Sequence, residues 1–369
     1  MNGKPVLHRN ARTVLTRKAE KFGHKMLCDG LTLNLGDACG FGCAYCYVGP
    51  QMLKLDKPAL VAYRDQTGTS VSHCDVVIRR CNALGLLEAQ LVRKNGTDVY
   101  HDPLDQRVVF SSTTVDPAAN MTLLRETAAA CNLIFRHTSF QLRLLSKSAL
   151  LAKLVTDGMI PAEHHHRLIL GFSIGTLDDQ VAAAIEHHAS RPSARLKALH
   201  ELQDRGLRTF GMICPSLPQS DYAAFSGEIC KAIRAERCEH VWAEVINVRG
   251  KSLTKTSGCL RAAGLKREAV RLERVSGPRN REAREAYARQ TFLAHAKTVR
   301  PEKLRFLQYI DEASADWWRD QKSNGAVLIG KVAEKLGLVA SGAPPAVPPP
   351  AVARRRKSSP TRRGKPTPA

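Results

Sequence analysis

Between residues 31 and 248, apolar and polar residues follow two different patterns. Short apolar or β-branched runs predict strands, and longer stretches with apolar residues three or four positions apart predict helices. Six strands are expected over residues 31–35, 107–114, 140–146, 167–175, 208–214 and 241–248. Helices are expected over residues 75–94, 117–132, 149–157, 193–205 and 222–236. Strands that alternate with helices at this spacing predict right-handed βα units and a parallel sheet.

A parallel sheet of six such strands, when it curves, forms a partial barrel. We therefore expect an α/β fold, a partial (β/α)6 barrel. In barrels built from βα units, functional residues lie on the loops that follow the strands, at the strands' C-terminal ends. We therefore expect the site of this protein where those loops meet.

The pattern changes on both sides of this core, which we assign to residues 31–260. Residues 1–30 are expected to be an N-terminal arm that leads into the first strand, and no chemistry is assigned to them. Residues 261–338 are rich in charged helical stretches, and the pair Trp317 and Trp318 is expected to dock this region onto the core. Residues 339–369 are rich in Pro and Arg and are expected to form a disordered tail.

Three cysteines, Cys39, Cys43 and Cys46, follow the first predicted strand in a glycine-containing loop with the spacing C-x3-C-x2-C. Thiolates this close on a flexible loop can converge on one soft metal centre. Three of them suit an iron–sulfur cluster better than a structural zinc site, which takes four ligands. A [4Fe-4S] cluster held in this way keeps one iron open. The alternative is a zinc site completed by a distant ligand such as Cys28.

The chain carries a net charge of +22, which is its second informative feature after the cysteine spacing. A basic excess of this size attracts polyanions and is typical of nucleic-acid-binding proteins. The tail contributes +7, from seven Lys and Arg residues and no acidic residue, and the rest of the chain still carries +15. The alternative interpretation is an arginine-rich composition that serves no binding role.

Other features of the sequence bear on its location. It has no apolar run of about 18 residues, so no membrane span is expected. Residues 1–22 are basic and lack the apolar segment of a secretion signal. Eleven cysteines at irregular spacings are not typical of a disulfide framework, and an oxygen-sensitive cluster needs a reducing compartment. We therefore expect a cytoplasmic protein.

The cysteine spacing, with Tyr45 just before the third cysteine, resembles the signature of the radical S-adenosylmethionine superfamily. Four further stretches, each after a predicted strand, resemble its spore photoproduct lyase branch, also described as DNA repair photolyase-like. They cover residues 111–117, 146–148, 173–178 and 215–218. This resemblance extends from residue 31 to about residue 250. It implies that Cys39, Cys43 and Cys46 hold a [4Fe-4S] cluster that cleaves S-adenosylmethionine to a 5′-deoxyadenosyl radical.

The same resemblance implies roles for three further residues. Lys147 corresponds to a lysine that pairs with the carboxylate of S-adenosylmethionine, and Ser173 to a serine that bonds the cofactor. Tyr45 corresponds to an aromatic residue whose backbone lies near the adenine. The resemblance also implies a nucleic-acid substrate and an electron donor such as a flavodoxin or ferredoxin.

One residue departs from the pattern of this branch. Thr113 stands where a hydrogen-donating cysteine is expected, and the O–H bond of threonine is too strong to quench a carbon-centred radical. Repair of the spore lesion by the family mechanism is therefore not expected.

Several residues and two other functions stay open. The residues 164–166, all histidine, are expected to face water rather than bind a metal, and Cys74 and Cys81 are expected to be structural. Cys214 is either a radical relay or, as we favour, a buried core thiol. The protein could instead be a radical enzyme that acts on a peptide or small metabolite, or a non-enzymatic zinc-binding nucleic-acid protein.

Overall fold

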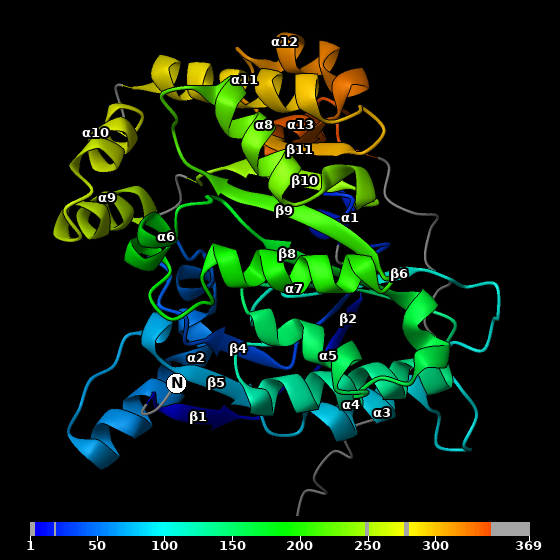
Figure 1. Cartoon of the computed structure of the whole chain (residues 1–369). Coiled ribbons are helices and arrows are strands. Elements are labelled where there is room, and N and C mark those ends of the chain that lie inside the picture. Colours follow the sequence, from blue (N-terminus) through cyan, green and yellow to red (C-terminus); the bar gives the residue numbers. More distant parts are fainter. Residues whose placement is uncertain (1–3, 18–19, 248–250, 277–279, 341–369) are drawn as a thin grey trace, which may run out of the picture.

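The structure is a computed structural model that describes residues 4–17, 20–247, 251–276 and 280–340 (Figure 1). Within these residues, nine strands form one large sheet in the order β12-β11-β10-β9-β8-β7-β6-β3-β2. Neighbouring strands are parallel, apart from the antiparallel pair β2 and β3. The predicted α/β class and parallel sheet are confirmed. The strands are β2 (Leu15–Arg17), β3 (Leu31–Leu33), β6 (Val108–Ser111), β7 (Gln141–Ser146), β8 (Leu168–Ser173), β9 (Arg208–Ser216), β10 (Val241–Val245), β11 (Leu304–Tyr309) and β12 (Ala326–Ile329).

The six predicted strands correspond to β3 and β6 to β10, which are neighbours in chain order. Over the described residues the sheet is wider than the six strands predicted, because β11 and β12 extend one side and β2 the other. The C-terminal region expected to be helical thus also contributes strands. Strands β11 and β12 are short apolar runs between charged segments, and all four residues of β12 are buried.

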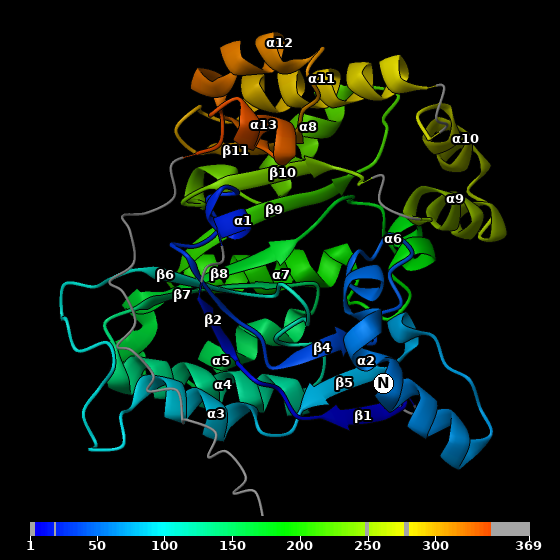
Figure 2. The same ribbon diagram turned by 180° about the vertical axis from the view of Figure 1, so that it is seen from behind.

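The two faces of the large sheet pack against different parts of the chain. Along β8, Leu168, Leu170 and Phe172 enter the main apolar core, whereas Ile169 points to a second core on the opposite face. Helices cover the first face in Figure 1, and Figure 2 shows α1 and the N-terminal segment over the other. The helices of this part are α1 (Glu20–Gly23), α4 (Met121–His137), α5 (Lys153–Thr156), α6 (Asp179–Ile185), α7 (Pro192–Asp204) and α8 (Tyr222–Ala232). Phe22, Leu27 and Cys28 pack in this second core, so residues 20–30 of the predicted arm cover part of that face.

Among the described residues a second, small sheet has the strand order β1-β5-β4, from β1 (Val6–Arg9), β5 (Val77–Arg80) and β4 (Gly36–Cys39). The helix predicted over residues 75–94 is wrong in its first half, because Val77–Arg80 form a strand that pairs with β1 and β4. Only the second half is helical, as α3 (Ala83–Leu91). A long helix, α2 (Val48–Thr67), follows the cysteine loop.

The C-terminal layer consists of β11 and β12 with the helices around them. These helices are α9 (Ser252–Ala262), α10 (Lys266–Arg274), α11 (Arg281–Thr298), α12 (Ala315–Asp320) and α13 (Lys331–Lys335). Trp318 is fully buried and stacks on Phe306 of β11 at 5.9 Å, which confirms the predicted docking role of the tryptophan pair. The predicted disordered tail lies outside the described residues from position 341 onward. None of the helices in the described ranges has the length and apolar character needed to cross a membrane.

Candidate cofactor site at the C-terminal edge of the sheet

The three predicted cluster cysteines lie on one loop between β4 and α2. Cys39 is the last residue of β4, and Cys46 lies two positions before α2 begins at Val48. Gly40 and Gly42 have φ values of 70° and 66°, the left-handed region that favours glycine. The glycines therefore allow the tight turns that bring the three cysteines into one loop.

Backbone hydrogen bonds hold this loop from both sides. The Ala44 N–H donates to Ile185 O at 2.9 Å, and the His188 N–H donates to Phe41 O at 3.0 Å. On the other side, the Gly42 N–H donates to Cys74 O at 3.0 Å. The segment after α6, which includes His188, thus clamps the cysteine loop through its backbone.

The three thiols share one apolar surrounding. Cys43 is buried and packs with Phe41, Val77, Val115 and Leu123, and Cys39 and Cys46 pack at the margin of the same cluster. Each of the three lies close enough to another to interact with it electrostatically. Burial raises the pKa of Cys39 to about 12 and, together with nearby Glu186, raises that of Cys43 well above its ordinary value.

Cys46 has a different environment, because the Cys74 thiol is its hydrogen-bond partner. This bond lowers the pKa of Cys46, against the opposing effect of burial, and the backbone N–H groups of Val48 and Gly49 at the start of α2 act in the same direction. Cys74, expected to be structural, is therefore a direct neighbour of a predicted cluster ligand.

The position of Cys28 bears on the zinc alternative. Within the described ranges, no three His, Cys, Asp or Glu side chains are arranged to hold one metal ion. Cys28, the suggested fourth zinc ligand, is buried in another apolar cluster with Phe110, Ile169 and Phe210. It therefore lies in a different cluster from the three loop cysteines, and both the [4Fe-4S] cluster and a zinc site stay predictions.

The three residues predicted to bind S-adenosylmethionine lie together beside this loop. Lys147 follows β7, and its Nζ donates to Ser173 Oγ at the end of β8 at 2.7 Å. The Ser173 hydroxyl donates in turn to Cys214 O at 2.7 Å. Lys147 Nζ also lies 5.6 Å from the centre of the Tyr45 ring. The sheet thus brings residues from distant parts of the chain into one polar group.

Glu186 lies at the centre of this polar group. It is 4% exposed, accepts hydrogen bonds from Arg195 and from the Tyr45 hydroxyl, and lies 4.0 Å from Lys147 Nζ. Burial, with the nearby Glu186 carboxylate, raises the pKa of Tyr45 well above its ordinary value. Arg195, itself 1% exposed, also donates to Ser173 O at 2.5 Å.

Sequence analysis assigned no role to Glu186 or Arg195. The sequence did contain an indication that Arg195 is buried, because it lies on the same helix face as Ala198, Leu199 and Leu202 of α7. A charged residue among buried helix positions requires a buried partner.

Asp116 fixes the backbone next to Lys147. Its carboxylate accepts the Ser146 hydroxyl and the Lys147 N–H, both at 2.7 Å, and the Ala118 N–H at 2.9 Å. Burial raises the pKa of Asp116, although these hydrogen bonds oppose the shift. The carboxylate therefore ties the loop after β6 to the end of β7, where Lys147 emerges.

Two residues considered for hydrogen transfer have defined places. The buried Thr113 hydroxyl donates to Asn34 Oδ1 at 2.6 Å. Cys214 Sγ lies 3.9 Å from Glu244 Oε2 near the end of β9, and burial raises the pKa of this thiol to about 12. The choice between relay and core thiol for Cys214 stays open.

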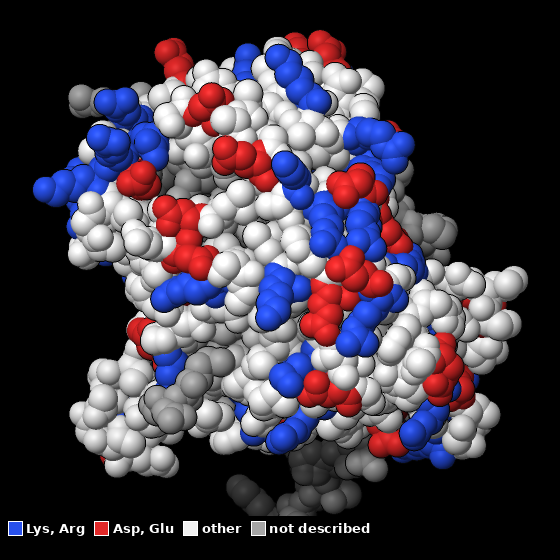
Figure 3. Space-filling view, viewed as in Figure 1, with Lys and Arg blue, Asp and Glu red and all other residues white. Residues whose placement is uncertain are grey.

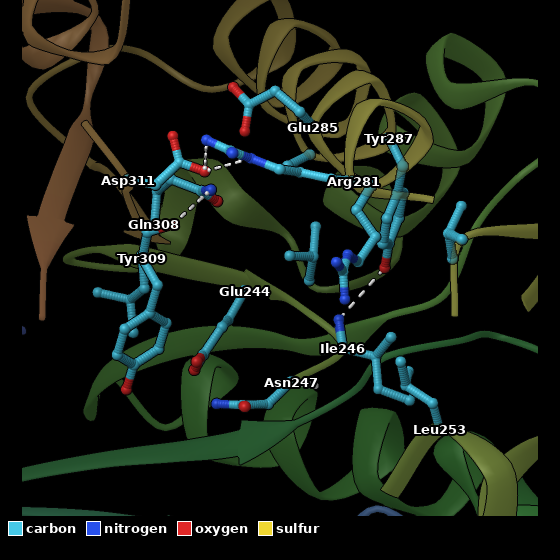
Figure 4. Close-up of a pocket in the computed structure, with 15 residues that line it drawn as sticks. Glu244, Ile246, Asn247, Leu253, Arg281, Glu285, Tyr287, Gln308, Tyr309 and Asp311 are labelled. Atoms are coloured by element: carbon cyan, nitrogen blue, oxygen red, sulfur yellow. Dashed lines mark hydrogen bonds and ion pairs between the residues drawn. The ribbon is translucent and has the colours of Figure 1, made fainter. Parts of the chain in front are cut away.

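A cavity of about 420 Å³ opens at the ends of β10 and β11 (Figure 4). Glu244, Asn247 and Tyr309 line it from the sheet, and Arg281 pairs with Asp311 at 2.7 Å across from them. Its lining residues are Glu244, Val245, Ile246, Asn247, Leu253, Val275, Arg281, Arg284, Glu285, Tyr287, Ala288, Leu307, Gln308, Tyr309 and Asp311. Both polar and apolar groups are thus available to a ligand.

Lys25 and Tyr47 connect this cavity to the cysteine loop. Lys25 Nζ lies 3.7 Å from Glu244 Oε2, so the N-terminal segment does supply a charged group here. Tyr47, the residue after Cys46, interacts electrostatically with both Lys25 and Glu244. Its hydroxyl donates to Thr113 O at 2.9 Å.

Of the comparisons with known proteins, the one with solved structures gives matches. The sequence matches no family model and no curated protein. A solved variant of spore photoproduct lyase shares 14% identity over 74% of this chain and 80% of that chain, with a TM-score of 0.48. A second variant, with bound AdoMet and dinucleoside spore photoproduct, matches with the same values. A third shares 13% identity over 69% of this chain and 66% of that chain, with a TM-score of 0.46.

The chain is similar to spore photoproduct lyase. This is the branch that its motifs resemble, and the match is one of overall structure at 13–14% identity.

Proposed function

We propose that this protein is a cytoplasmic radical S-adenosylmethionine enzyme that acts on a nucleic acid. The observation that carries the proposal is the position of the C-x3-C-x2-C loop, with Cys39, Cys43 and Cys46, directly beside the Lys147 and Ser173 side chains. When bound, a reduced [4Fe-4S] cluster would supply the electron that cleaves S-adenosylmethionine to a 5′-deoxyadenosyl radical. A flavodoxin or ferredoxin is the proposed class of electron donor.

The residues of the polar group would bind and orient the cofactor. The Lys147 ammonium, held by Ser173 Oγ at 2.7 Å, would pair with the cofactor's carboxylate. Glu186 and Arg195 are positioning residues, because they fix Tyr45 and the Ser173 backbone without needing to touch the substrate. Groups already fixed in this way need little rearrangement when the cofactor binds.

The apolar side chains around the cysteines would protect the radical. Phe41, Val77 and Val115 pack against the cysteine loop and exclude water from one side of it. On the open side, the substrate itself would have to complete this protection.

The nucleic-acid substrate is supported by the net charge of +22 and by the motif resemblance. Thr113 supports a substrate other than the spore lesion, because its hydroxyl is a poor hydrogen-atom donor and is already bonded to Asn34. We propose that the reaction differs from that of the family in its hydrogen-transfer step.

The direct test is reconstitution of the protein with iron and sulfide without oxygen, followed by reduction and assay of 5′-deoxyadenosine. We expect product from the wild-type protein and none from Cys43→Ala. Cys81→Ala is the matched control, because Cys81 is exposed and lies outside the cysteine loop. If Cys43→Ala forms product at the wild-type rate, the proposed ligand set is wrong.

A radical enzyme with a small-molecule substrate is the second candidate. The cavity of about 420 Å³ favours it, because that volume is typical of pockets for small ligands. Fluorescence anisotropy with labelled DNA and RNA separates the candidates, since binding to phosphates must weaken steeply as salt rises.

A further inference from the structure

The helical hairpin formed by α9 and α10, residues 251–274, is called here the basic hairpin. It contains seven Lys and Arg residues and two Glu, a net charge of +5 in 24 residues. Figure 3 shows these basic side chains gathered over α9 and α10, at the upper left of that view. The charged helical stretches predicted from residue 261 onward include α10, whereas most of α9 falls within the predicted core.

The inner face of the basic hairpin is apolar and packs on the predicted cofactor site. Leu253, Leu260 and Leu272 belong to one apolar cluster with Ala44 of the cysteine loop, and Tyr45 packs against that cluster. The hairpin is therefore attached beside the cysteine loop, and its orientation is fixed by this packing.

The outer face carries charges that the protein itself does not neutralise. Arg261 pairs with Glu273 and Arg271 with Glu268, which accounts for both acidic residues of the basic hairpin. Five other basic residues are exposed and, among the residues that the structure describes, pair with no acidic side chain. They are Lys251, Lys255, Lys266, Arg267 and Arg274.

This charged face begins next to the site. Lys255 lies on α9, whose Leu253 and Leu260 pack in the same apolar cluster as Ala44 of the cysteine loop. Leu253 also lines the cavity of Figure 4. A polyanion bound along the basic hairpin would therefore lie near both the cavity and the cysteine loop.

We infer that the basic hairpin binds the phosphate backbone of the nucleic-acid substrate and holds one nucleotide at the cavity. The inference rests on the proposed function and adds the surface that recognises the substrate. Lys and Arg contacts to phosphates fix the position of a nucleic acid but do not read its sequence. Sequence or lesion recognition would then fall to the cavity.

A nucleic acid fits this surface better than an anionic membrane does. A helix that binds at a membrane surface inserts an apolar face into the lipid. In the basic hairpin the apolar face is buried against the protein core. Among its described residues, Val270, which is 37% exposed, is the one large apolar side chain that is exposed.

The test compares two full-length variants of equal charge. The first combines Lys255→Gln, Lys266→Gln, Arg267→Gln and Arg274→Gln. The control combines Lys94→Gln, Arg125→Gln, Arg136→Gln and Lys197→Gln, which are also exposed and lie near α3, α4 and α7. Binding of a fluorescein-labelled DNA duplex and of its single strand is measured by polarisation across salt concentrations, with thermal unfolding to verify folding.

The hairpin variant should bind duplex DNA at least about tenfold more weakly at low salt, and its slope of log K against log salt should be shallower by about 3. The control should keep a slope close to that of the wild type. If both variants bind DNA as tightly as the wild-type protein and with the same salt slope, the inference is wrong and the proposed function still stands. If the wild-type protein binds neither the duplex nor the single strand, both the inference and the proposed substrate are wrong. Formation of 5′-deoxyadenosine still tests the radical chemistry separately.

Discussion

Glu186 and Arg195 in the polar group beside the cysteine loop, and Trp318 in the C-terminal aromatic layer, are all buried but have different surroundings. Glu186 and Arg195 are 4% and 1% exposed, and each is the other's ion-pair partner. Trp318 lies among the rings of Phe292, Phe306 and Trp317. Buried ion pairs add little net stability, because desolvation offsets their attraction, whereas buried rings stabilise strongly. We therefore expect the two charges to serve the proposed site, and the rings to stabilise the fold.

Truncation of the aromatic layer should have the largest effect on stability. Trp318→Ala should lower the free energy of unfolding by about 3–5 kcal/mol, because it leaves a cavity against Phe306. Trp317→Ala should cost less, since Trp317 is only half-buried. Urea unfolding measures both. A loss below about 1 kcal/mol for Trp318→Ala would contradict the structural role of the layer.

Removal of one charge from the polar group should be almost as damaging. Glu186→Ala should cost about 3–5 kcal/mol, because Arg195 is then left buried without its partner. In the double variant Glu186→Leu with Arg195→Met, stability should largely return while affinity for S-adenosylmethionine does not. Urea unfolding and equilibrium dialysis measure the two quantities. Recovery of both would show that the pair has no role in the site.

Acid should weaken the C-terminal layer through His295. Burial lowers its pKa from 6.5 to about 4, so the unfolded chain binds a proton more readily than the folded protein does. The stability it contributes is full above pH 6.5 and falls as the pH drops toward 4, by up to about 3 kcal/mol at about 1.4 kcal/mol per pH unit. In His295→Gln this part of the pH dependence of unfolding should disappear. Replacement of the exposed His101 by Gln is the control, and an unchanged slope in His295→Gln would contradict the prediction.

The smallest effect on stability should accompany a clear effect on binding. Lys147→Met should change the free energy of unfolding by less than about 1 kcal/mol, because Lys147 is partly exposed and its contact with Ser173 is a single hydrogen bond. Affinity of the reconstituted protein for S-adenosylmethionine should fall about tenfold, which corresponds to about 1.4 kcal/mol. Equilibrium dialysis measures this change. An unchanged affinity would remove Lys147 from the proposed cofactor site.

The sequence was most informative where local pattern and structure coincide. The strands β3 and β6 to β10 were predictable because each is a short apolar run, and β6 to β10 are each followed by a helix. The group of Tyr45, Lys147 and Ser173 was accessible only through motif resemblance, since nothing local indicates that these residues meet. The spacing of Cys39, Cys43 and Cys46 needed no such help to indicate a cluster.

Other features depend on contacts that the sequence pattern does not encode. Strand β5 was taken for helix because four residues are too few to show a period, and its pairing with β1 and β4 decides its conformation. The partners of Glu186 and of Cys46 come from distant segments, so neither the buried ion pair nor the contact with Cys74 was foreseen. The basic hairpin was visible as composition, but its place beside the cysteine loop required the structure.

We propose that Cys39, Cys43 and Cys46 hold a [4Fe-4S] cluster with one iron open to S-adenosylmethionine. The most direct measurement is iron and labile sulfide content, with electron paramagnetic resonance of the reduced protein before and after S-adenosylmethionine is added. We predict about four irons and four sulfides per chain, a spectrum that changes when S-adenosylmethionine binds, and loss of both in the variant with all three cysteines replaced by Ala. Zinc in place of iron, or equal iron in that variant, would contradict the account.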